Sequence, residues 1–160
     1  MRAVKSAIKR AVKGAASVLG ALNAAHTPDT RILTYHSVGR REHEMNVQPD
    51  MFRRQMAWLA QNAAVIPLDE AARLQPGVAI TFDDGYRDNL LNAAPVLTDL
   101  GLPATVFVVP GRVGGNLDHD HARQNAHLLD WDEIRRLEDM GFAIGAHTLT
   151  HPRLASLGTA

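Results

Sequence analysis

The chain has 160 residues, enough for one domain with a hydrophobic core. Hydrophobic residues make up 46% of the sequence and charged residues 21%, which is typical of a globular chain. The 17 basic residues balance the 17 acidic ones, so net charge gives no reason to propose nucleic-acid binding, and the absence of cysteine excludes disulfide bonds and a thiol nucleophile.

The N-terminal segment, residues 1–27, differs in composition from the rest of the chain. Residues 1–25 are rich in alanine, contain basic but no acidic side chains, and repeat apolar residues at helical spacing. This pattern predicts an amphipathic helix, too short and polar to span a bilayer. Such a helix suits a peripheral contact with an anionic membrane, a weak signal peptide or a solvated leader. We favour a cytoplasmic or membrane-peripheral location over secretion.

From residue 28 onward, short apolar runs alternate with helical patterns, which favours parallel β–α units. Helical patterns begin at Pro49, at Asp88 and at Asp130, where Glu133 completes a capping pair; the second is interrupted near Pro95. The predicted core strands lie at about residues 31–35, 78–82, 104–109 and 142–146.

Two adjacent carboxylates, Asp83 and Asp84, close the apolar run at 78–82. Neighbouring carboxylates at a buried strand end repel each other and lose hydration, and a cation relieves both costs. We therefore expect one aspartate to bind a metal ion and the other to be available as a base. A surface Asp-Asp-Gly turn is the alternative interpretation of this segment.

Two histidines, His147 and His151, follow the apolar run at 142–146. Pro152 disfavours a helix through His151, because the residue before a proline avoids the helical region. We expect His147 at the end of a strand and His151 in the following loop, where two imidazoles can bind one ion. A pair of loop histidines without a ligand is the alternative.

Two further groups of residues are candidates for binding. The segment Asp118-His119-Asp120-His121 contains metal-ligand side chains, but its glycine-rich surroundings favour a solvated loop. His36 follows the first predicted strand and is expected at the same rim as Asp83 and His147, where active sites of parallel barrels gather.

The two motifs together resemble the polysaccharide deacetylases of the NodB-homology type, in carbohydrate esterase family 4. Thr-Phe-Asp-Asp-Gly stands at residues 81–85, and His-Thr-x-x-His stands at residues 147–151. The resemblance extends over about residues 28–157. It implies a distorted (β/α) barrel, of which 28–160 would be the N-terminal part of the catalytic domain.

The resemblance also implies a role for each residue of the site. Asp84, His147 and His151 would bind one divalent metal ion, for which zinc is favoured, and Asp83 would act as the catalytic base. His36 and Tyr86 are candidates for substrate contact or for support of the site; the alternative for His36 is a rim histidine with satisfied hydrogen bonds and no role in the reaction. The implied reaction is metal-dependent hydrolysis of N-acetyl or O-acetyl groups on a polysaccharide or amino-sugar substrate.

The family's later motifs, which include its catalytic acid, have no counterpart among these 160 residues. We therefore expect a partial barrel, truncated after about four strands, and little deacetylase activity from this chain by itself. An inactive metal-binding module and a membrane-associated, non-catalytic fragment are the alternatives.

Overall fold

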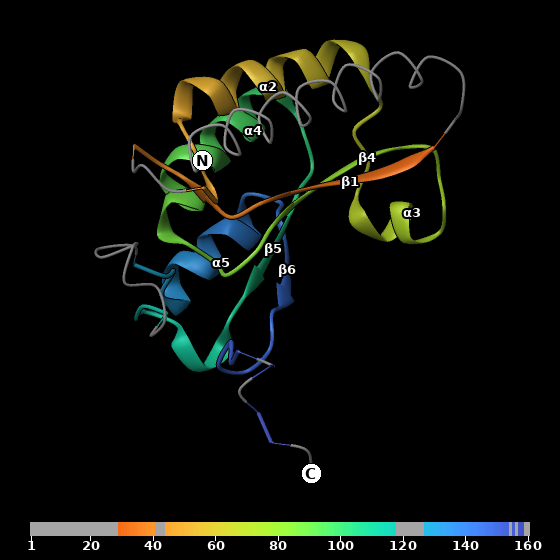
Figure 1. Ribbon diagram of the computed structural model, residues 1–160. Coiled ribbons are helices and arrows are strands. Elements are labelled where there is room, and N and C mark those ends of the chain that lie inside the picture. Colours follow the sequence, from red (N-terminus) through yellow and green to blue (C-terminus); the bar gives the residue numbers. More distant parts are fainter. Residues whose placement is uncertain (1–28, 41–43, 118–126, 154, 156, 159–160) are drawn as a thin grey trace, which may run out of the picture.

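The computed structural model describes residues 29–40, 44–117, 127–153, 155 and 157–158 (Figure 1). The predicted helix at 1–25 and the candidate group at 118–121 lie outside these residues. No helix within the described part of the chain is both long and apolar enough to cross a membrane.

A parallel sheet organises the described residues, and its strand order is β1-β4-β5-β6. Strands β1 and β4 pair along their whole length, from Thr30 opposite Gly77 to Tyr35 opposite Phe82. Because the strands are parallel, their carboxyl ends meet at one edge of the sheet. The strands are β1 (Thr30–Tyr35), β4 (Gly77–Phe82), β5 (Thr105–Val108) and β6 (Ala143–Ala146), and a separate parallel pair is formed by β2 (Ser37–Val38) and β3 (Asn46–Val47).

Helices connect the strands and supply much of the hydrophobic core. Phe52, Leu97 and Leu137, from three different helices, belong to the same buried apolar cluster as Ile80 and Val106 of the sheet. Helices α2 and α4 lie beside each other in Figure 1 and are in contact. The helical elements are α2 (Pro49–Asn62), α3 (Leu68–Ala72), a π-helical turn (Asn89–Ala93), α4 (Ala94–Leu100), the 3-10 helix η2 (Pro110–Arg112) and α5 (Trp131–Asp139).

The fold confirms the predicted order of elements. All four predicted core strands are present, with ends within one residue or two of the predicted positions. The helical pattern from Asp88 is interrupted just before Pro95, where a π-helical turn gives way to α4, and Gly101 ends α4 in the left-handed conformation, at φ 64°. The capping box of Asp130 and Glu133 opens α5 as predicted.

Strands β1 and β6 are the two edges of the described sheet, so these residues form an open sheet and not a closed barrel. On β1, Ile32 is 54% exposed and Leu33 is 36% exposed, which is unusual for apolar residues in a parallel sheet. The open sheet of four parallel strands agrees with the partial barrel predicted from the sequence.

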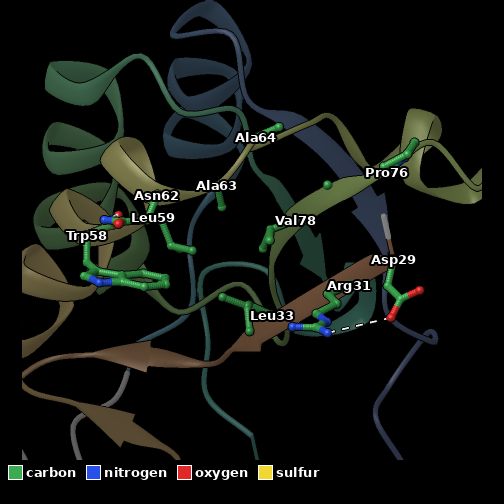
Figure 2. Close-up of a pocket in the computed structure, with 11 residues that line it drawn as sticks. Asp29, Arg31, Leu33, Trp58, Leu59, Asn62, Ala63, Ala64, Pro76 and Val78 are labelled. Carbon is green, nitrogen blue, oxygen red and sulfur yellow. Dashed lines mark hydrogen bonds and ion pairs between the residues drawn. The ribbon is translucent and has the colours of Figure 1, made fainter. Parts of the chain in front are cut away.

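A groove runs beside β1 near the C-terminal end of α2 (Figure 2). Leu33, Trp58 and Val78 contribute apolar side chains, and Asp29 forms an ion pair with Arg31 at 3.8 Å. Much of the groove lies at the amino-terminal ends of β1 and β4. It is therefore separate from the strand ends where the metal ligands were predicted.

Candidate metal centre

The turn after β4 carries Asp83 and Asp84 to the carboxyl edge of the sheet. The backbone N–H of Asp83 donates to the carbonyl of Tyr35 at 2.9 Å, which extends the pairing of β4 with β1 by one residue. Asp84 then adopts a left-handed conformation, at φ 73°, and is 3% exposed. Gly85 is also left-handed, and a Cβ there would lie 3.0 Å from Val108, so the turn packs tightly against β5.

The loop after β6 carries the two histidines. His147 directly follows the strand, and its N–H donates to the carbonyl of Val108 at 2.7 Å. Thr148 and His151 are both left-handed, at φ 59° and 53°, and the Thr148 hydroxyl accepts the N–H of His151 at 2.9 Å. The prediction of one histidine at a strand end and one in the loop is confirmed.

The two motifs converge on one point. Oδ1 of Asp84 lies 3.7 Å from Nε2 of His147 and 3.3 Å from Nε2 of His151. The two imidazole rings have centroids 5.1 Å apart, with an angle of 36° between their planes. One ligand atom from each of Asp84, His147 and His151 lies within 4.8 Å of the others.

This donor set fits a divalent ion. Ligand atoms at about 2.0–2.2 Å from a tetrahedral ion lie about 3.3–3.6 Å from one another, close to the separations seen here. Two imidazoles and one carboxylate are a common zinc ligand set that leaves a position open for water or substrate. Modest movements of the side chains would therefore complete coordination.

Backbone strain gathers at the same place. Asp84, Thr148 and His151 are three non-glycine residues with left-handed backbones, and Leu74, in a turn after α3, is the other such residue in the described ranges. Left-handed conformations of non-glycine residues cost about 1–3 kcal/mol each and persist where surrounding contacts impose them. Their presence in both ligand-bearing turns is typical of a functional site.

The remaining predicted residues occupy different surroundings. His36 directly follows β1, and its carbonyl accepts a hydrogen bond from the Asn89 side chain at 2.7 Å. Tyr86 is 1% exposed and packs in a buried apolar cluster with Val109 and Leu128. This burial favours a supporting role for Tyr86 over contact with a substrate.

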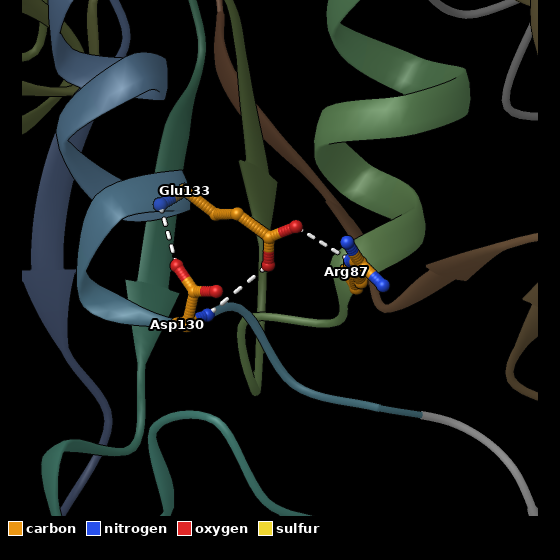
Figure 3. A network of polar contacts seen from close by, with 3 residues as sticks. All are labelled: Arg87, Asp130 and Glu133. Carbon is orange, nitrogen blue, oxygen red and sulfur yellow. Dashed lines mark hydrogen bonds and ion pairs between the residues drawn. The ribbon is translucent and has the colours of Figure 1, made fainter.

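A polar network supports the aspartate turn, and the sequence predicted only its Asp130–Glu133 capping pair (Figure 3). Arg87 donates through Nε to Oε1 of Glu133 at 2.5 Å, and its backbone N–H donates to the carbonyl of His127 at 2.8 Å. Glu133 also accepts the N–H of Asp130 at 3.2 Å, and Asp130 accepts the N–H of Glu133 at 2.8 Å. The network joins the turn after β4 to the first turn of α5.

A second network holds the segment after β1 against the π-helical turn. Asp88 accepts the Ser37 hydroxyl at 2.6 Å and the N–H of Val38 at 3.1 Å. Asn92 donates to the carbonyl of Val38 at 2.7 Å. Asp88 and Asn92 lie four residues apart in one helical stretch. This spacing by itself does not predict that both residues bond to the Ser37–Val38 segment.

A parallel β–α sheet with a carboxylate and two imidazoles at its carboxyl edge is an arrangement typical of metal-dependent hydrolases. The family model of the polysaccharide deacetylases matches residues 71–160, and the chain belongs to this family. The matched region includes all of Asp83, Asp84, His147 and His151.

Individual relatives agree with this assignment. The protein YxkH of Bacillus subtilis, named as a polysaccharide deacetylase, is 31% identical over 79% of this chain and 44% of its own length. A chitooligosaccharide deacetylase of Rhizobium leguminosarum is 33% identical over 57% of this chain and 36% of its own length. The chain thus spans less than half the length of these relatives.

A solved structure supports the fold as well. The IcaB protein of Ammonifex degensii superposes with a TM-score of 0.65 at 27% identity, covering 76% of this chain and 54% of that one. The similarity confirms that the described sheet corresponds to part of the deacetylase (β/α) barrel.

Proposed function

We propose that this chain carries the metal-binding part of a hydrolase that removes N-acetyl, or O-acetyl, groups from a polysaccharide or amino-sugar substrate. The convergence of Asp84, His147 and His151 is the observation that carries the proposal, and Asp83 precedes Asp84 in the chain. Family membership supports the reaction class, and the chitooligosaccharide deacetylase among the relatives supports an amino-sugar substrate.

Asp84, His147 and His151 would hold one divalent ion, with zinc favoured by the ligand set. An ion at such a site supplies Lewis acidity, which polarises a carbonyl group and promotes loss of a proton from water. Asp84 is buried, and its Oδ1 already lies within 3.7 Å of Nε2 of each histidine, so the site needs little reorganisation.

Asp83 is assigned as the general base. It lies at the same strand end as Asp84 and is only half-buried, which suits a residue that exchanges a proton with water. In the proposed reaction, Asp83 accepts a proton from the attacking water, the C–N bond of the acetamide breaks, and the amine leaves with a proton. The acid that delivers this last proton is not assigned to any described residue.

The experiment is acetate release from chitooligosaccharides at high protein concentration, with and without added zinc or cobalt. We expect slow, metal-dependent release, because a general acid typically contributes about 10²–10⁴-fold to such a step. Asp83→Asn and His147→Ala should each abolish it. Release that is equal in the three proteins would contradict the proposal, whereas metal binding with no release would favour an inactive metal-binding module.

The cellular location is a separate proposal. The basic segment 1–25 suits a peripheral contact with an anionic membrane in the cytoplasm. Flotation with phosphatidylserine vesicles should carry the full chain upward and lose this effect when residues 1–25 are deleted. Flotation that is independent of the segment would contradict the membrane contact.

A further inference from the structure

The loop that carries the two histidines is attached at its centre to Gly111. The backbone N–H of Gly111 donates to the carbonyl of Leu149 at 2.8 Å, and Leu149 lies between His147 and His151 in the sequence. The Leu149 side chain is 69% exposed, so burial of this side chain does not hold the loop. The attachment is made by the backbone.

Gly111 leaves no room for a side chain at this contact. A Cβ on Gly111 would lie 2.5 Å from the Leu149 carbonyl oxygen and 3.2 Å from Cγ2 of Thr150. Gly111 belongs to the 3-10 helix η2, and its φ is outside the left-handed region, so its conformation would suit other residues. The requirement for glycine here comes from close approach of two backbones, and not from φ.

The histidine loop depends on such an attachment because its own backbone is strained. Thr148 and His151, on either side of Leu149, are both left-handed. A hydrogen bond from the N–H of His147 to the carbonyl of Val108 fixes the start of the loop. The hydrogen bond from Gly111 to Leu149 fixes its middle. Displacement of the Leu149 carbonyl would therefore be transmitted directly to the two imidazoles.

The same segment is bonded to the turn that carries the aspartate ligand. The N–H of Gly114 donates to the carbonyl of Leu129, and the N–H of Leu129 donates to the carbonyl of Gly85, each at 2.9 Å. Gly85 is the residue after Asp84. The stretch from Gly111 to Gly114 thus connects, through backbone hydrogen bonds, the two turns that supply the three ligands.

We propose that Gly111 is a positioning residue of the metal centre, which sets the separation of the two imidazoles from Asp84 without touching the ion. This inference rests on the proposed function, because the role of Gly111 is to support metal binding. The effect of Gly111 on the positions of the imidazoles can still be measured in the metal-free protein. Replacing Gly111 by alanine should move the histidine loop. The backbone conformation of η2 should persist, because alanine can adopt it.

The experiment compares Gly111→Ala with two matched controls in the full chain. Gly115→Ala adds the same methyl group nearby, where its closest neighbour would be the Arg112 carbonyl oxygen at 3.3 Å. Leu149→Ala removes the exposed side chain and keeps the carbonyl that Gly111 contacts. Circular dichroism checks that each variant is folded.

Two readouts are used. Imidazole resonances of the metal-free protein, assigned with His147→Ala and His151→Ala, should shift for both histidines in Gly111→Ala and in neither control. Titration with Co²⁺, followed by its visible absorption, should show an affinity about 10–100-fold lower in Gly111→Ala, as is typical when support of metal ligands is lost.

Unmoved imidazole resonances in a folded Gly111→Ala variant would overturn the inference, as would an unchanged affinity for Co²⁺. Equal effects of Gly111→Ala and Gly115→Ala would also overturn it, because the loss would then be general. If the unmodified chain binds no Co²⁺, the proposed function fails, and the metal-free spectra still decide whether Gly111 positions the imidazoles.

Discussion

Oδ1 of Asp84 lies 3.3 Å from Nε2 of His151, although Asp84 follows β4 and His151 lies in the loop after β6. Strand β5 separates β4 from β6 in the sheet, so the two side chains meet across an intervening strand. Both residues have left-handed backbones, at φ 73° for Asp84 and 53° for His151. The site is therefore a product of two strained turns on a regular sheet.

Replacing either histidine with alanine should remove most of the affinity for a divalent ion. The site would keep only two of its three ligands, fewer than the three protein ligands usual for a catalytic zinc site. Calorimetric titration with Zn²⁺ measures the effect, and His127→Ala, which removes a histidine outside the ligand set, is the control. Unchanged binding in both His147→Ala and His151→Ala would rule out the assignment.

The two aspartates should respond differently to amide substitution. Asp84→Asn should weaken metal binding, because Asp84 is the buried carboxylate that faces both imidazoles. Asp83→Asn should retain the ion and lose acetate release, because Asp83 is assigned as the base. Metal affinity by calorimetry and acetate release by assay separate the roles. Equal loss of the ion in both variants would show that they are misassigned.

The sequence predicted the convergence of the ligands because each motif directly follows a predicted strand. Asp84 lies two residues after β4, and His147 lies one residue after β6. In a parallel sheet the carboxyl ends of strands share one edge, so residues at these positions meet whatever their distance along the chain. Pro152 then placed His151 in the loop and not in a helix.

The supports of the site were not predictable in the same way. The ion pair of Arg87 and Glu133 joins elements far apart in the sequence, and Glu133 was identified only as a helix cap. The need for glycine at Gly111 arises from its approach to Leu149, which no local pattern encodes. The short helix α3 is a single turn or so, too short for a clear apolar period.

Loss of the Arg87 side chain should destabilise the protein by about 1–2 kcal/mol, because Glu133 is buried and would lose a charged hydrogen-bond donor. The half-exposed position of Arg87 limits the effect. Urea unfolding of Arg87→Ala measures it. Arg135→Ala, which removes an exposed pair with Asp132, should cost less than about 1 kcal/mol, and equal losses in the two variants would contradict the structural role.

Tyr35 should make the stability of the fold sensitive to alkaline pH. Burial raises the pKa of its hydroxyl above the ordinary value of 10.0, because desolvation disfavours the phenolate. The centroid of its ring lies 5.2 Å from that of Phe52 and 5.7 Å from that of Phe82. The hydroxyl donates to Oε1 of Gln55 at 3.1 Å. Ionisation in the fold therefore requires a charge beside the aromatic part of the core.

The direction of the pH effect follows from the different pKa of Tyr35 in the folded and unfolded states. A tyrosine in the unfolded chain loses its proton near its ordinary pKa, whereas Tyr35 in the folded protein keeps its proton to higher pH. The contribution of Tyr35 to the free energy of unfolding is fully present below the pKa of the unfolded state. It is lost as pH rises through the pKa of the folded state. Urea unfolding from about pH 8 to about pH 11 should show a declining free energy of unfolding, and Tyr35→Phe should reduce the decline. An identical decline in Tyr35→Phe would show that other groups cause the alkaline sensitivity.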